Sequence, residues 1–255
     1  MTGEARTAGW PPVLLVTGTD TGVGKTVVTA ALAAVLSRGP GRGPAVDKPA
    51  QTGIGAPAGG DDGRSAVGGD EADTDVVTRL SGVGAVSEGV RLRAPMAPVA
   101  AARREGTALP SGEQHLERLS DLSRRHDHLL VEGSGGVLVA LADDGTTLPD
   151  LGTALAGRLG AGRVGAVVVC RAGLGTLNHT ALTVEALERR QVPVTGVVIG
   201  SWPAVPDEVD LDNRRHLARG HVPLLGAVPA GAGRLPGPRF RRAAPGWFRT
   251  PPAGR

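Results

Sequence analysis

Short apolar runs rich in valine and leucine recur along the chain, and most of them are followed by glycine-containing turns. Runs of this kind predict buried strands. Five such strands are expected, at Val13–Thr17, His128–Glu132, Gly165–Cys170, Val194–Ile199 and Pro223–Val228, and Ala45–Asp47 is expected to end another.

Between these runs, several segments space their apolar residues three and four positions apart, which predicts helices. The expected helices are Thr26–Ser37, Asp73–Leu80, Pro98–Glu105, Gly112–His126 and Thr176–Arg190. Strands that alternate with helices predict an α/β fold, with a mostly parallel sheet and helices on both of its faces. Ligands of such sheets bind at the carboxyl ends of the strands.

Two segments do not follow this pattern. The glycine-rich residues 53–70 predict a mobile loop. Residues 232–255 are rich in proline and arginine, and their pattern predicts no regular structure. We therefore expect one domain over residues 1–231 and a C-terminal tail over residues 232–255.

The net charge of +3 raises the question of nucleic-acid binding. Six of the 28 basic residues lie in the acid-free segment from Arg234 to Arg255, and the other 22 stand against 25 acidic residues. The basic character therefore belongs to the tail. Its Phe240, Trp247 and Phe248 leave binding of single strands open as an alternative, but we expect a solvated or docking tail and no nucleic-acid partner.

The single cysteine, Cys170, excludes an internal disulfide and favours a reducing compartment. The N-terminus has no signal-peptide pattern, and no apolar run approaches the roughly 20 residues of a membrane span. We therefore expect a soluble, cytoplasmic protein with no membrane partner.

The segment Gly18–Thr26, GTDTGVGKT, follows a predicted strand and opens a predicted helix, which is the context of a phosphate-binding loop. It indicates a P-loop NTPase-like fold whose backbone amides cradle the phosphates of ATP. Lys25 is expected to reach the β- and γ-phosphates, and the Thr26 hydroxyl to bind Mg²⁺. Five residues rather than four separate Gly18 from Gly24, so a glycine-rich turn without a ligand is the alternative.

A magnesium site also needs carboxylates. Glu132 ends a predicted strand, so it lies beside the P-loop if the two strands are neighbours. A second carboxylate is expected among Asp70, Glu71, Asp73 and Asp75, and Asp73 is the best choice because it begins a predicted helix. A capping or solvated role is the alternative for each of these acids.

Only two basic residues are lysines, Lys25 and Lys48, and the other 26 are arginines. In a chain that prefers arginine, a surviving lysine points to a position that needs a compact ammonium. Lys48 opens the segment Lys48–Gly53, where it could stabilise charge on a transferring phosphoryl group. A surface lysine retained by chance is the alternative.

Together these motifs resemble the dethiobiotin synthetase family. The matching segments are GTDTGVGKT at 18–26, KPAQTG at 48–53, VEGSGG at 131–136, LGTLNHTALT at 174–183 and PLLGAVP at 223–229. They occur in the family's order between about residues 13 and 231, so the resemblance implies a single P-loop synthetase domain over residues 1–231.

The resemblance implies that 7,8-diaminopelargonate takes up CO₂ as a carbamate, that ATP phosphorylates the carbamate, and that the second amine closes a ureido ring. It also implies Mg²⁺ as cofactor, ATP as co-substrate and a homodimer. The implied roles are catalytic for Lys25 and Lys48, metal-binding for Thr26, Asp73 and Glu132, and substrate-binding for Thr52 and Asn178. The implied nucleotide contacts are Gly22, Val23, Gly24, Lys25, Thr26, Val27, Asp73, Glu132, Gly133, Ser134, Gly135, Gly200, Ser201, Pro229, Ala230 and Gly231.

The chain departs from the family at two nucleotide positions. Gly22 replaces a frequent glutamate. Gly200 stands where many members have an asparagine, and glycine has no side chain to read a base edge, so base selectivity stays open. A ParA/MinD-like ATPase switch is the alternative function, but that class carries a lysine five residues before the P-loop lysine, where this chain has Asp20.

Overall fold

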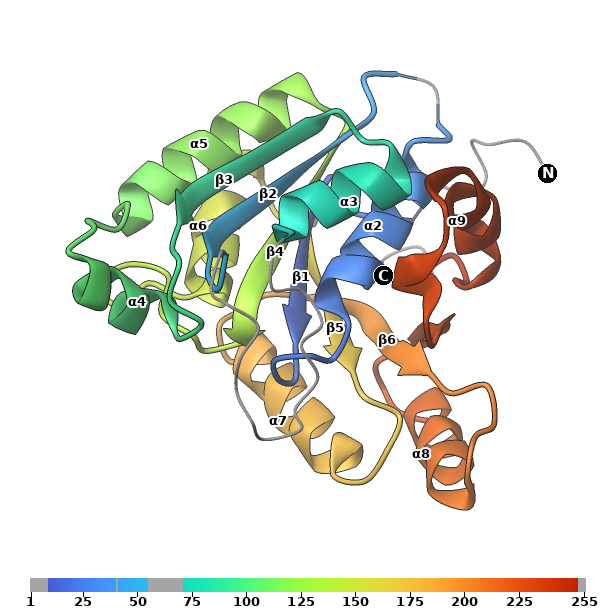
Figure 1. Cartoon of the computed structure of the whole chain (residues 1–255). Helices are drawn as coiled ribbons and strands as arrows, with labels where there is room; N and C mark the ends of the chain where they lie inside the picture. The colour runs from blue at the N-terminus through green and yellow to red at the C-terminus, as the bar shows by residue number, and fades with distance from the viewer. Residues whose placement is uncertain (1–8, 40, 55–70, 252–255) are drawn as a thin grey trace.

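The computed structural model describes residues 9–39, 41–54 and 71–251. In this part of the chain, seven parallel strands form one sheet in the order β3-β2-β4-β1-β5-β6-β7 (Figure 1). The strands are β1 Val13–Gly18, β2 Pro44–Gln51, β3 Ala85–Arg91, β4 His128–Gly136, β5 Val164–Cys170, β6 Val194–Trp202 and β7 Leu224–Pro229. The predicted α/β class with a parallel sheet is confirmed.

Helices cover both faces of the sheet (Figure 1). They are α2 Lys25–Leu36, α3 Asp73–Ser81, α4 Pro98–Glu105, α5 Gly112–Arg125, α6 Leu148–Leu159, α7 Thr176–Glu188, α8 Glu208–Ala218 and α9 Gly237–Ala243. Helices α2, α3 and α9 pack on one face, and α5, α6 and α7 pack on the other. Within the described residues, no helix is both long and apolar enough to cross a membrane.

The alternation of side chains along each strand decides which face a residue joins. In β1, Leu14 belongs to the apolar core under α2 and α3, whereas its neighbour Leu15 belongs to the core under α5 to α7. Val46 of β2 and Leu130 of β4 also join the α2 core. Two residues further along β2 and β4 are Lys48 and Glu132. Their side chains therefore lie on the same face of the sheet, near the start of α2.

The structure extends several predicted elements and adds others. Strand β4 continues to Gly136, so Glu132 lies within the strand rather than at its end, and β6 continues through Gly200 to Trp202. Strand β3 and helices α6 and α8 were not predicted from the sequence. Residues 55–70 of the predicted mobile loop lie outside the described residues.

The tail also carries structure that its composition did not predict. Short 3₁₀ turns at Ala232–Arg234 and Ala244–Gly246 flank α9, and Phe248 forms an antiparallel bridge with Gly226 at β7. The Phe240 ring is completely buried and meets Trp247 edge-on at 5.1 Å between ring centroids. The aromatic rings needed for nucleic-acid stacking therefore pack against the protein core, and the tail docks on the α2 face.

We expect Phe240→Ala to lower the free energy of unfolding by about 3–5 kcal/mol, because it empties a fully buried site that cannot collapse completely. Urea denaturation would measure the loss. The exposed Arg242→Ala in the same helix is the control and should change stability by no more than about 0.5 kcal/mol. Equal stability of the two variants would contradict docking of the tail in solution.

Candidate active site

The turn between β1 and α2 has the backbone geometry of a phosphate-binding loop. Gly22 and Gly24 have φ values of 74° and 95°, a region that favours glycine. Gly24 precedes α2, and no side chain among the described residues caps this helix end. The first backbone N–H groups of α2 are thus available to an anion, as the P-loop prediction requires.

Lys25 is the first residue of α2, and its ammonium donates a hydrogen bond to the Asp20 carbonyl at 2.9 Å. Burial, and then the neighbouring Lys48 ammonium, lower the pKa of Lys25 to about 8. The lysine folds back along the loop, where phosphate oxygens would offer its ammonium stronger acceptors.

Thr26, Asp73 and Glu132 come from three elements that are distant in the sequence and meet beside the P-loop. The Thr26 hydroxyl lies 2.9 Å from Asp73 Oδ1 and 2.9 Å from Glu132 Oε1. A hydroxyl has one proton and can donate to only one of these oxygens at a time. Asp73 is the first residue of α3, as predicted from the sequence, whereas Glu71 pairs with Arg79.

This set of oxygens fits Mg²⁺. Two carboxylates and a hydroxyl are hard oxygen donors of the kind this ion prefers. Glu132 Oε2 is buried and has no hydrogen-bond partner among the described residues, so one carboxylate oxygen is left to accept a cation.

The Lys48 ammonium contacts the same two carboxylates, those of Asp73 and Glu132. Its Nζ lies 2.7 Å from Asp73 Oδ2 and 2.9 Å from Glu132 Oε1, and it donates to the Gly133 carbonyl at 3.0 Å. The residue is only 4% exposed. Burial disfavours the Lys48 ammonium, but Glu132 and Asp73 outweigh burial and raise its pKa above the usual value.

The reciprocal effect appears at Asp73. Burial favours its neutral form, yet Lys48 and the Thr26 hydroxyl together hold the pKa of Asp73 below its ordinary value. Two ammonium groups and two carboxylates therefore share this part of the site with balanced charge.

Gln51 completes the cluster, although it was not predicted from the sequence. Its side-chain Oε1 accepts a hydrogen bond from the Asp73 backbone N–H at 3.0 Å, and its Nε2 donates to the Thr52 carbonyl at 3.1 Å. Gln51 thereby joins the end of β2 to the start of α3. Its position inside the KPAQTG segment was the available signal.

The glycine-rich end of β4 holds the neighbouring strand. The Gly133 carbonyl accepts from Lys48, and the Ser134 hydroxyl donates to the Ala50 carbonyl. Gly135 has a φ of 67° and lies close to the Thr21 hydroxyl. These residues line the site through backbone and hydroxyl groups.

Gly200 packs directly on the P-loop. A Cβ atom at Gly200 would lie 2.0 Å from the Val23 carbonyl, and one at Gly24 would lie 2.7 Å from the Gly200 carbonyl. An asparagine therefore does not fit at position 200 on this backbone. This close approach explains by packing why position 200 is a glycine here, where many members of the resembled family have an asparagine.

The other predicted contacts lie at the carboxyl ends of strands or near them. Val27 is half-buried in the first turn of α2, Thr52 follows β2, and Asn178 is exposed in the first turn of α7. Exposed groups at the ends of β6 and β7 are Ser201, Pro229, Ala230 and Gly231. The Ala230 N–H donates to the Trp202 carbonyl at 2.7 Å, which joins these two strand ends.

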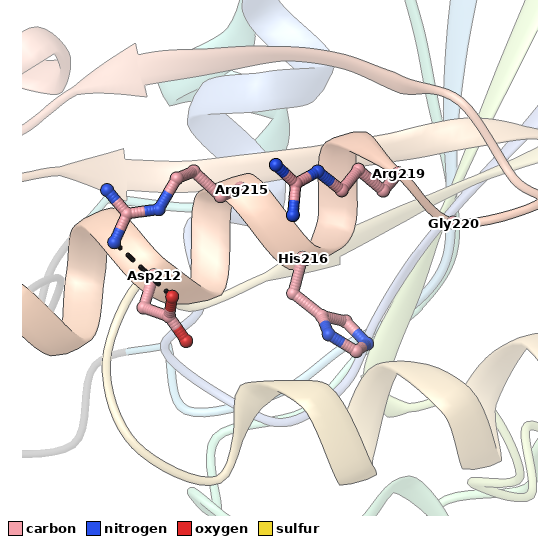
Figure 2. Close-up of a pocket in the computed structure, with 5 residues that line it drawn as sticks. All are labelled: Asp212, Arg215, His216, Arg219 and Gly220. Carbon is pink, nitrogen blue, oxygen red and sulfur yellow. Dashed lines mark hydrogen bonds and ion pairs between the residues drawn. The ribbon is translucent and has the colours of Figure 1, made fainter.

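A hollow along α8 and the residues that follow it is separate from this cluster. It is lined by Asp212, Arg215, His216, Arg219 and Gly220 (Figure 2). Arg215 points toward Asp212, with 3.3 Å between Nη2 and Oδ1, and all five residues are exposed. No P-loop residue or carboxylate of the cluster lines it, so the hollow does not mark the candidate site.

Comparison with known proteins places similarity along nearly the whole chain. Residues 13–232 match the family described as an AAA domain. The ATP-dependent dethiobiotin synthetase of Mycobacterium sp. (strain JLS) is 47% identical over 241 residues, which cover 92% of this chain and 97% of the relative. The enzyme of the same name from Rhodococcus jostii (strain RHA1) is 48% identical, covering 92% and 94% of the two chains. A third, from Streptomyces coelicolor, is 46% identical, covering 94% and 93%.

Proposed function

The chain belongs to the ATP-dependent dethiobiotin synthetase family, and we propose that its reaction takes place where Lys48, Asp73 and Glu132 meet beside the P-loop. It is a ligase of biotin biosynthesis that uses ATP. The observation that carries the site assignment is the buried Lys48 ammonium, held against two carboxylates at the start of the P-loop helix. We place the reaction in the cytoplasm, where ATP is available.

The substrates proposed are 7,8-diaminopelargonate, CO₂ and ATP. One amine adds to CO₂ and loses a proton, which gives a carbamate. A carbamate oxygen then attacks the γ-phosphorus of ATP, and ADP leaves. The second amine attacks the carbonyl carbon of this mixed anhydride, closes the ureido ring and releases phosphate. No protein nucleophile is needed, so the protein contributes positioning and charge neutralisation.

The two lysines have separate tasks in this proposal. Lys25, at the N-terminus of α2, binds β- and γ-phosphate oxygens together with the free backbone N–H groups. Lys48 shares the carboxylates of Asp73 and Glu132 with the Thr26 hydroxyl, and its proposed task is to hold a carbamate oxygen and a γ-phosphate oxygen close to each other. The burial of the two lysines supports these roles, because an ammonium acts more strongly on developing negative charge where water is excluded.

Thr26, Asp73 and Glu132 are the proposed ligands of Mg²⁺. When bound, the ion would neutralise charge on the β- and γ-phosphates. The converging oxygens and the unpaired Glu132 Oε2 support this role. The nucleotide base is proposed to lie over the ends of β6 and β7, at Gly200, Ser201 and residues 229–231.

We propose a homodimer formed through the face that carries α7 and the end of β4. Leu182 of α7 is 56% exposed and Leu138 is 52% exposed, and both line an apolar hollow that reaches Thr19 of the P-loop. Exposed leucines beside a site are typical of an interface. Thr52 and Asn178 are the proposed substrate contacts, and Asn178 shares this face.

Leu182→Glu is therefore expected to yield a monomer, because it places a charge in the apolar centre of the interface. Sedimentation equilibrium would measure the mass, and turnover should fall at least about tenfold if the partner completes the site. Leu211→Glu, on the exposed side of α8, is the matched control and should remain dimeric. A dimeric Leu182→Glu protein would place the interface elsewhere.

The function is tested by omission. Phosphate release should require diaminopelargonate, bicarbonate and Mg²⁺ together, and removal of any one should reduce it to background. Assays with several nucleoside triphosphates would measure base preference in the same format. Phosphate release that is independent of the diamine would contradict the proposed function and favour an ATPase switch.

A further inference from the structure

Lys48 stands at the point where β2 loses one of its neighbours. The pairing of β2 with β4 runs from Pro44 opposite His128 to Asp47 opposite Val131. The pairing of β2 with β3 begins earlier, at Ala45 opposite Ala85, and continues past this point, with Lys48 opposite Glu88 and Gln51 opposite Arg91. The residue after Lys48, Pro49, has no N–H to donate. The separation of β2 from β4 opens the site, but it leaves the Lys48 backbone with strand support on one side.

An ion pair between the buried Asp47 and the partly buried Arg118 supports the strand at this point from the opposite face of the sheet. Asp47 is completely buried, and its carboxylate accepts two hydrogen bonds from Arg118 of α5, at 2.9 Å from Nε and 3.2 Å from Nη2. Asp47 and Lys48 are consecutive in a strand, so their side chains lie on opposite faces. Arg118 thus binds β2 on the face that packs against α5, while the Lys48 side chain extends from the other face into the site.

His115 extends this contact to the other strand of the site. Arg118 Nη2 donates to His115 Nδ1 at 2.9 Å, and an arginine has no acceptor to offer in return. The proton of His115 therefore lies on Nε2, which faces the Leu141 carbonyl at 3.4 Å. Leu141 belongs to the loop that follows β4, the strand of Glu132.

Gly89 allows these side chains to approach β2 closely. A Cβ atom at Gly89 would lie 2.3 Å from the Pro49 carbonyl, 2.7 Å from His115 Cε1 and 2.8 Å from Arg118 Nη2. The absent side chain of Gly89 therefore leaves room for His115 and Arg118 beside β2, where Arg118 binds Asp47, the residue before Lys48.

We infer that Arg118 is a positioning residue, which fixes the Lys48 ammonium against Asp73 and Glu132 through its bidentate contact with Asp47. This inference rests on the proposed role of Lys48. The P-loop belongs to β1 and α2, whereas Arg118 forms its hydrogen bonds with Asp47 of β2 and His115 of α5. Loss of Arg118 should therefore impair turnover much more than nucleotide binding.

The test compares Arg118→Met, which keeps side-chain length but removes the fork, with Arg118→Lys, which keeps the charge. In Arg118→Met, kcat should fall by about 10- to 100-fold, because small misplacement of a reacting group has effects of this size. The KM for ATP should stay within about twofold of the wild-type value. The kcat of Arg118→Lys should lie between that of the wild type and that of Arg118→Met. Arg124→Met, an exposed change in the same helix, is the control and should leave both constants unchanged.

A second comparison separates positioning from general damage. In a Lys48→Met background, Arg118→Met should reduce the remaining turnover by less than about twofold, because both residues act through the same ammonium. If the unpaired Asp47 carboxylate prevents Arg118→Met from folding, the Asp47→Asn/Arg118→Met double variant removes the buried charge and takes its place.

The inference is overturned by a folded variant with wild-type kcat, or by an equal fold-loss in the two backgrounds. The wild-type protein is assayed first for the ureido product. A wild-type protein that makes no product rejects the proposed function, whereas a productive wild type with an equally productive Arg118→Met rejects only the role of Arg118.

Discussion

Lys48→Arg is expected to lower kcat by about 100- to 1,000-fold, the size of effect seen when a preorganised donor to developing charge is lost. Lys48 is 4% exposed, and its ammonium lies within 3.0 Å of three oxygens. A planar guanidinium is larger and presents its donors in a fork, so it cannot replace a compact ammonium among these oxygens. ATP binding should persist, because the P-loop is a separate segment.

Steady-state kinetics with saturating diamine and bicarbonate would measure the loss, and binding of a fluorescent ATP analogue would check the P-loop. The exposed Arg104→Lys makes the reverse exchange outside the site and should have wild-type turnover. Near-normal turnover in Lys48→Arg would mean that this lysine survives by chance in an arginine-rich chain.

Glu132→Gln should have the second largest effect, because Glu132 serves both Thr26 and Lys48. The change leaves the buried Lys48 ammonium with one carboxylate, Asp73, so the loss of folding stability should stay below the about 3–5 kcal/mol of a buried ion that loses its pair completely. It also removes a proposed magnesium ligand. The Mg²⁺ concentration for half-maximal turnover should rise by at least about tenfold.

Urea denaturation and magnesium titration would measure these two effects separately. Glu71→Gln is the control, because Glu71 lies close to Asp73 in sequence but forms an exposed pair with Arg79. Such pairs contribute at most about 1 kcal/mol. An unchanged magnesium requirement in Glu132→Gln would exclude Glu132 from the metal site.

The parts of the fold that could be predicted are those in which one segment carries its own signal. Strands β1, β4, β5, β6 and β7 are continuous apolar runs, because a parallel sheet covered on both faces buries both sides of each strand. Strand β3 lies at the sheet edge and is half-exposed, so it has no continuous apolar run that would predict it.

Helices α6 and α8 show two ways in which a pattern can hide an element. Helix α6 contains Pro149 in its first turn and Gly152, whose absent side chain makes room for Leu15. Helix α8 is mostly charged and has few apolar residues to space. Both helices begin with capping boxes, at Thr147 and Asp207, which were the available signals.

The site residues also divide into those that one segment could predict and those that depend on contacts between segments. The P-loop could be predicted from a strand, a glycine-rich turn and a helix that are contiguous in the chain. Asp73 could be chosen from an acidic run because it begins a predicted helix, but its contact with Thr26, 47 residues away, depends on the fold. The contacts of Gln51 and Arg118 could not be predicted, because they join segments distant in sequence; only Gln51 carried a signal, its position inside the KPAQTG segment.

The most direct test of the central claim is turnover with ¹³C-labelled bicarbonate, followed by mass spectrometry of the product. The proposed chemistry predicts a ring-closed ureido product that carries the label in its carbonyl carbon, formed in equal amount with phosphate and only when Mg²⁺ and ATP are present. Phosphate release without a labelled ureido product would contradict it.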